Sequence, residues 1–187
     1  MPVVVRLEGV GVPVTGETVT LAALNAADQA DFTGAIGFVF EHSPWIASEA
    51  WKSRPFRDCD DLYRAMCAVL ERASDDQKLS LIRAHPDLAG KLAVATGLTA
   101  ESAREQASAG LDSLTPEEFA DFTRLNAAYR DRFGFPFIIC VREHTRASIL
   151  TAFEKRIAHE RHAEIRTALD EVTKIARLRL LDAVSSD

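Results

Sequence analysis

The residues best suited to chemistry begin with a histidine that precedes a proline, in His85-Pro86-Asp87-Leu88-Ala89-Gly90-Lys91. Proline disfavours the α conformation in the residue before it, so His85 should end one helix and Pro86 should open the next. Residues at such breaks face clefts more often than residues in mid-helix. With an ordinary pKa of about 6.5, an imidazole there suits acid–base catalysis. Taken alone, however, the pattern favours a helix-ending imidazole bonded to a backbone carbonyl.

A second group of polar side chains shares one face of a predicted helix. Ser102, Glu105 and Gln106 stand at positions i, i+3 and i+4, which places a hydroxyl, a carboxylate and an amide together. Their neighbours on the helix are mostly alanines, so the helix can pack closely against other elements. The residues alone favour a solvated face, and Glu101 with Arg104 indicates that this helix has one.

The apolar run from Phe135 to Val141 follows a glycine and contains a proline. Gly134 permits an unusual backbone angle, which favours a turn over Gly134-Phe135-Pro136-Phe137-Ile138. The length and β-branching of the run would also fit a buried strand, but a single run has no partner strand. We therefore expect an extended turn that fills the core and enters a helix, with backbone N–H groups after Pro136 facing a pocket.

Two charged groups lie nearer the C-terminus. Arg179 is one of several arginines on a predicted helix, where it would ordinarily be a surface charge. The sequence His159-Glu160-Arg161-His162 lacks the His-Glu-x-x-His spacing that sets two imidazoles one turn apart as zinc ligands, so we expect no metal there. The charged run over residues 154–166 predicts a solvated helix face.

Length and composition restrict the class of protein. A chain of 187 residues with a formal net charge of −6 fits one acidic domain, and it lacks the basic balance typical of nucleic-acid binders. No apolar run approaches the length of about 20 residues that spans a bilayer, and no signal peptide is recognised at the start. Cys59, Cys67 and Cys140 have no metal-ligand spacing. They favour a reduced, structural role in a cytoplasmic protein.

The elements that must position these groups are helices. Residues 1–20 predict an irregular or hairpin-like arm, and residues 21–187 predict an all-α domain of about eight helices. Capping signals and apolar periodicity place helices in residues 26–40, from Pro44, from Asp58, and over residues 75–84, 99–109, 116–132, 145–158 and 161–183.

Several motifs in this order resemble one family of enzymes. The matching pieces are residues 85–91, 98–106, 109–111, Leu125-Asn126 with Tyr129, 133–138 and 175–180. Together they resemble the OHCU decarboxylases of urate breakdown, which act on 2-oxo-4-hydroxy-4-carboxy-5-ureidoimidazoline. The resemblance runs from about Leu21 to Ala183, so it covers nearly the whole chain and leaves residues 1–20 outside.

The resemblance implies roles for the residues above. It makes His85 and Glu105 catalytic, and it assigns substrate binding to Ser102 and Gln106 of the same helix face. It also implies substrate contacts, largely through main chain, from Pro86, Phe137, Ile138, Ile139, Cys140 and Val141. Arg179 would bind a carboxylate or ureido group of the substrate through paired hydrogen bonds. A homodimer is a further implication.

The implied reaction needs no cofactor, because the ring carbon that bears the carboxylate adjoins a C=N bond able to accept the electron pair. His85 and Glu105, converging in one cavity sized for a small heterocycle, would control the protons and yield (S)-allantoin and CO2. Two alternatives are a non-catalytic helical interaction module and a metal-dependent hydrolase that uses His159 and His162. Bound metal would favour the hydrolase, and failure to bind allantoin would favour the module.

Overall fold

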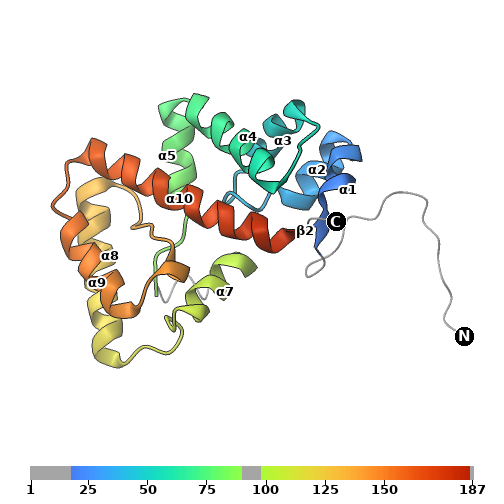
Figure 1. The fold of residues 1–187 in the computed structure, drawn as a ribbon. Helices are drawn as coiled ribbons and strands as arrows, with labels where there is room; N and C mark the ends of the chain where they lie inside the picture. Colours follow the sequence, from blue (N-terminus) through green and yellow to red (C-terminus); the bar gives the residue numbers. More distant parts are fainter. Residues whose placement is uncertain (1–17, 90–97, 186–187) are drawn as a thin grey trace, which may run out of the picture.

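Helices dominate the computed structural model, which describes residues 18–89 and 98–185 (Figure 1). In these residues it contains the α-helices α1 (Leu21–Ala26), α2 (Gln29–Ile36), α3 (Pro44–Ala50), α4 (Cys59–Arg72), α5 (Asp75–Ala84), α7 (Ala100–Ser108), α8 (Pro116–Phe133), α9 (Arg146–Arg156) and α10 (Arg161–Ala183). Two 3-10 turns, η1 (Trp51–Ser53) and η2 (Val141–Glu143), and two short strands, β1 (Val19–Thr20) and β2 (Val184–Ser185), complete the description. The prediction of an all-α domain is confirmed.

Helix starts follow the capping signals in the sequence. Asp58 caps α4 by accepting a hydrogen bond from the backbone N–H of Asp61, as predicted. Thr115 and Glu118 form a reciprocal capping box at the start of α8, whose first residue is Pro116. The predicted bounds of α5 and α10 are those observed, and Ser74 caps α5 with Gln77 in a capping box, whereas no side chain caps α10.

The predicted helix over residues 26–40 is too long. The chain forms α2 only over Gln29–Ile36 and then turns, although Val39 and Phe40 are fully buried in the core. A tight turn that buries two apolar residues extends the apolar spacing of the helix before it, so the periodicity could not show where α2 ends. The turn carries Glu41 and His42 to the start of α3.

A small parallel pairing between the two ends of the described chain was not predicted. Val19 pairs with Val184 and Thr20 with Ser185, which ties β1 to the residues just after α10. The predicted arm over residues 1–20 otherwise falls on residues 1–17, which lie outside the described residues. The division into residues 1–20 and 21–187 therefore stays a prediction.

The apolar run after α8 is an irregular segment, which agrees with the expected turn rather than with a strand. Gly134 ends α8 with a φ of 77°, in the left-handed region that glycine adopts readily. Residues 136–140 form neither helix nor strand, and η2 follows at Val141. The rings of Phe137 and Phe153 stack with centroids 3.7 Å apart, so the run packs into the core under α9.

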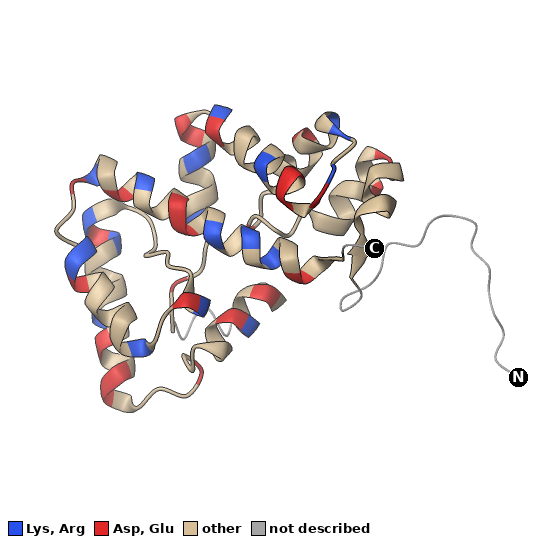
Figure 2. Cartoon of the chain, viewed as in Figure 1, with Lys and Arg blue, Asp and Glu red and all other residues tan. Residues whose placement is uncertain are grey.

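The long helix α10 crosses the molecule between the group α1–α5 and the group α7–α9 (Figure 1). It packs against α4 and α5. Acidic and basic residues are mixed along the helices rather than gathered in a region of one sign (Figure 2). Among the described helices, none is long and apolar enough to cross a membrane.

The prediction of a solvated face over residues 154–166 is wrong for two residues. Arg156 and Glu164 are buried, and Arg156 Nε donates to Glu164 Oε1 over 2.8 Å. The hydroxyl of Tyr129 also donates to Glu164, and His159 Nδ1 lies 2.7 Å from its other oxygen. Because each buried charge has partners, a run of charges in the sequence can enter the core.

Candidate active site

His85 stands where α5 ends. It is the C-terminal cap of the helix, with φ −73° and ψ 141°, as expected for a residue that precedes proline. Its Nδ1 lies 2.9 Å from the carbonyl oxygen of Leu81. Because a carbonyl only accepts, the neutral ring carries its proton on Nδ1 and leaves Nε2 as a proton acceptor. Burial lowers the pKa of His85 to about 4, so the ring is neutral near pH 7.

The residues after His85 differ from the prediction that Pro86 opens a helix. Pro86 lies outside any helix, and Leu88 and Ala89 form a turn instead. Ala89 has a φ of 54°, which is uncommon for a residue with a side chain. The continuation of this segment, residues 90–97, lies outside the described residues.

Two buried amides hold this turn in place. Gln106 accepts a hydrogen bond from the backbone N–H of Ala89 over 3.0 Å and donates to the carbonyl oxygen of Asp87 over 3.3 Å. Asn126 Nδ2 donates to the carbonyl oxygen of Leu88 over 2.8 Å. The Gln106 amide is therefore engaged by the backbone next to the histidine, which makes it a support for that turn.

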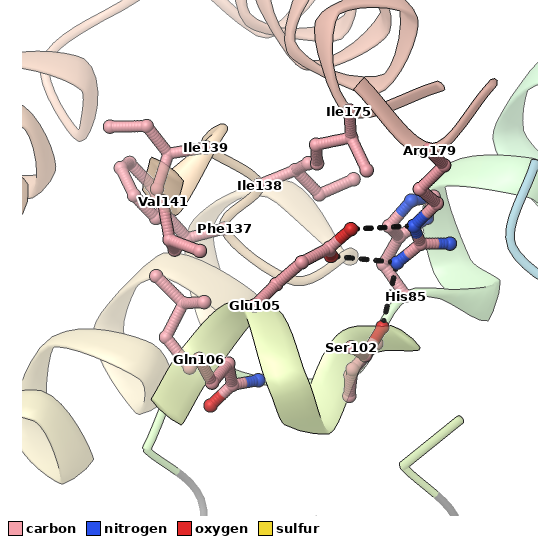
Figure 3. A pocket seen from close by; sticks show the side chains of 12 residues that line it. His85, Ser102, Glu105, Gln106, Phe137, Ile138, Ile139, Val141, Ile175 and Arg179 are labelled. Atoms are coloured by element: carbon pink, nitrogen blue, oxygen red, sulfur yellow. Dashed lines mark hydrogen bonds and ion pairs between the residues drawn. The ribbon is translucent and has the colours of Figure 1, made fainter. Parts of the chain in front are cut away.

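The face of α7 chosen from the sequence does turn inward. Ser102 and Gln106 are buried, and Glu105 points from the same helix toward Arg179 of α10 (Figure 3). Arg179 Nε donates to one oxygen of Glu105 over 2.7 Å, and Nη2 donates to the other over 2.8 Å. This paired arrangement is the strong geometry for a guanidinium and a carboxylate.

Arg179 is almost fully buried rather than a surface charge. Its Nη2 also donates to Ser102 Oγ over 3.0 Å, and its Nη1 donates to Glu41 Oε2 over 2.7 Å. Burial acts to lower the pKa of Arg179, but the hydrogen bonds and charges of Glu105 and Glu41 outweigh it and raise that pKa. The site thus holds a permanent cation between two carboxylates.

Glu41 is a site residue that the sequence analysis missed. Its side chain is 0% exposed, and it accepts hydrogen bonds from Thr99 Oγ1 over 2.7 Å and from Ser102 Oγ over 2.9 Å. Burial acts to raise its pKa, yet the charge of Arg179 and the bond from Thr99 hold the pKa below its ordinary value. The one signal in the sequence was a lone carboxylate between the apolar Val39-Phe40 and Ser43-Pro44.

Part of the backbone of the run 137–141 is already bonded within the protein. The N–H of Cys140 donates to Glu171 Oε2 over 2.7 Å, and the carbonyl oxygen of Ile138 accepts from Arg156 Nη1 over 2.7 Å. Burial raises the pKa of the Cys140 thiol to about 11, so it stays protonated. The N–H of Cys140, one of the main-chain groups expected to contact substrate, is therefore already bonded to Glu171.

These elements line a small cavity of about 30 Å³ that is partly open to solvent. All the predicted site residues except Cys140 border it, and Leu88 and Ile175 complete its lining. His85 and Glu105 thus border the same cavity, as predicted, although its volume corresponds to roughly a water or two rather than to a heterocycle. Glu105 and Arg179 also border a neighbouring groove of about 620 Å³, so their ion pair stands between the cavity and the groove.

The histidines proposed for the alternative metal site lie elsewhere. His159 bonds to Glu164, and the exposed His162 pairs with Arg166 over 2.7 Å. Within residues 18–89 and 98–185, no group of three or more His, Cys, Asp or Glu side chains is arranged to hold a metal ion. The cysteines described there are free thiols.

Comparisons with known proteins show the family of the chain. The family model described as OHCU decarboxylase matches residues 25–181. A 2-oxo-4-hydroxy-4-carboxy-5-ureidoimidazoline decarboxylase from Haloferax volcanii is 46% identical over 90% of this chain and 98% of its own. Its counterpart from Mus musculus is 38% identical over 89% of this chain and 93% of its own. The crystal structure of an (S)-allantoin synthase superposes with a TM-score of 0.69 at 35% identity, covering 89% of this chain and 54% of that one. The chain belongs to the OHCU decarboxylase family.

Proposed function

We propose that this chain decarboxylates 2-oxo-4-hydroxy-4-carboxy-5-ureidoimidazoline to (S)-allantoin and CO2 in urate breakdown. The observation that carries the proposal is that His85, just after α5, and Glu105 of α7 border the same cavity beside the buried cation Arg179. Family relatives that bear the name of this activity cover nearly the whole chain and support the choice of substrate.

The substrate supplies its own electron sink. When the bond from C4 to the carboxylate breaks, CO2 leaves and the electron pair forms a C4=C5 double bond as the C5=N bond opens. The ring nitrogen then takes up a proton. Tautomerisation moves the C4 hydroxyl proton away, leaves a C4 carbonyl and places a proton on C5. The protein has only to orient the carboxylate and manage these protons, which is the work of positioned acid–base groups.

In this scheme His85 and Glu105 share the proton transfers. The neutral His85 presents Nε2 as an acceptor for the hydroxyl proton, because its Nδ1 is bonded to Leu81. The proton that His85 takes from the hydroxyl can then pass to C5, directly or through the Glu105 carboxylate. Transfer to one side of C5 only would set its configuration. Arg179 binds a carboxylate or urea oxygen of the substrate. Ser102, Gln106, Pro86 and the run 137–141 shape the site around it.

The proposed enzyme is a cytoplasmic homodimer that uses neither cofactor nor metal. Sedimentation analysis of the purified chain tests the dimer directly: a mass near twice that of the 20.5 kDa chain supports it, and a mass near that of one chain rules it out. We assign no nucleic-acid or membrane partner to this acidic protein.

Turnover is tested on substrate generated from urate in the same cuvette. The disappearance of the ureidoimidazoline should be faster than its spontaneous decay in proportion to the amount of protein added. A rate that does not depend on protein concentration would rule out the decarboxylase. Metal analysis of the same preparation and direct binding of allantoin separate the hydrolase and the non-catalytic module from it.

A further inference from the structure

Every N–H donor of Arg179 is already used. Nε bonds to Glu105, Nη2 bonds to Glu105 and Ser102, and Nη1 bonds to Glu41 and, over 3.4 Å, to the carbonyl oxygen of Phe38. A guanidinium has no further donor to offer and never acts as an acceptor. A polar group of the substrate can therefore reach Arg179 only by displacing one of these acceptors.

The acceptor best placed to leave is Glu105. In the part of the chain that the structure describes, its carboxylate bonds to Arg179 alone, and its side chain borders both the cavity and the groove. Glu41 is different, because Thr99 and Ser102 also donate to it and its side chain is fully buried. Moving Glu41 would break its bonds to Thr99 and Ser102 and leave Arg179 Nη1 without its charged acceptor inside the protein.

We propose that Glu41 is a positioning residue of the active site, which keeps Arg179 anchored through Nη1 while the opposite edge of Arg179 exchanges Glu105 for the substrate. This inference rests on the proposed role of Arg179 in binding substrate. The exchange would release Glu105 for proton transfer in the same step that seats the substrate. Glu105 and Arg179 border both the small cavity and the groove, so opening their pair would join the two and provide the volume that the small cavity lacks.

The backbone at Glu41 supports a fixed anchor. The next residue, His42, has a φ of 46°, in the left-handed region that is uncommon for residues other than glycine and that makes the chain turn sharply after Glu41. Glu41 is held between the turn and the cap of α7, since Thr99 also caps that helix. The charge of Glu41 also acts on His85. Burial lowers the pKa of His85, and the charges of Arg179 and His42 lower it further, whereas the charge of Glu41 raises it.

The test is kinetic. Glu41→Gln keeps an acceptor for Arg179 Nη1 but removes the charge. Without that charge, Arg179 should move together with Glu105 and should no longer be held in place to bind the substrate. We expect KM for the ureidoimidazoline to rise by about tenfold or more while kcat changes by less than about threefold. Glu118→Gln is the matched control, because Glu118 forms an ion pair of 3.2 Å with Arg146 and does not line the cavity. It should leave both constants unchanged.

A double-mutant cycle with Arg179→Lys shows whether Glu41 acts through Arg179. If it does, Glu41→Gln should change KM by less than about twofold in the Arg179→Lys background. Full additivity of the two effects would overturn the inference, as would a Glu41→Gln enzyme with wild-type kinetics. Wild-type kinetics in Arg179→Lys alone would instead contradict the proposed role of Arg179. If Glu41→Gln does not fold, Glu41→Asp takes its place: it keeps the charge but shortens the reach, and an unchanged KM in that variant also overturns the inference.

Discussion

Glu105 and Arg179 lie 74 residues apart in the sequence and meet through paired hydrogen bonds of 2.7 and 2.8 Å. Their meeting joins α7 to α10 and forms the boundary between a cavity too small for the proposed substrate and a groove large enough for it. One ion pair thus separates the two spaces and also holds a proposed catalytic carboxylate.

Replacing Glu105 by Gln should reduce turnover by about two to four orders of magnitude, the usual contribution of a positioned acid–base group. The amide still fits against Arg179, so the fold should survive, which far-ultraviolet circular dichroism and the melting temperature would show. Initial rates of ureidoimidazoline loss measure the effect. Glu118→Gln makes the same chemical change outside the site and should keep wild-type rates. A folded Glu105→Gln enzyme with near-native turnover would show that the assignment is wrong.

Stability should fall between pH 7 and pH 5 through His85. Its pKa is about 4 in the folded chain, against about 6.5 when unfolded, so the unfolded state binds the proton more readily. The contribution of neutral His85 to the free energy of unfolding is present above pH 6.5 and is lost as the pH falls toward 4. By pH 5 the loss is about 2 kcal/mol. Urea unfolding at both pH values should show a smaller loss for His85→Gln than for the wild type. Equal pH dependence in the two proteins would contradict a buried neutral histidine.

The buried cluster around Glu164 should respond unequally to two substitutions. Glu164→Gln leaves the charge of Arg156 buried without its counter-ion and should cost about 3–5 kcal/mol. Tyr129→Phe removes only one of the donors to Glu164 and should cost about 1.5–3 kcal/mol. Denaturant midpoints of the two variants measure the difference. A Glu164→Gln protein as stable as Tyr129→Phe would mean that Arg156 does not depend on Glu164.

The sequence predicted local features well because their causes are local. Thr115 with Glu118, and the proline after His85, determine helix ends through bonds and clashes within a few residues. The face Ser102, Glu105 and Gln106 follows from helical spacing alone, although only the family resemblance indicated that it turns inward.

Buried charges were harder to predict. Glu41 and Glu164 resemble surface residues in the sequence, because the partners that allow their burial come from distant segments. Arg179 reaches Glu41 across 138 residues, and Tyr129 reaches Glu164 across 35. The parallel pairing of β1 with β2 was missed for the same reason, since two residues per strand leave no periodicity to detect.

The optical activity of the product tests the central claim most directly, because spontaneous decay of the ureidoimidazoline gives racemic allantoin. Urate is oxidised enzymatically in the presence and in the absence of this protein, and circular dichroism of the allantoin formed is followed with time. We predict that the wild-type chain yields the (S) enantiomer, and that His85→Gln and Glu105→Gln each yield product close to the racemate. Racemic allantoin from the wild-type protein, formed at the uncatalysed rate, would contradict the account.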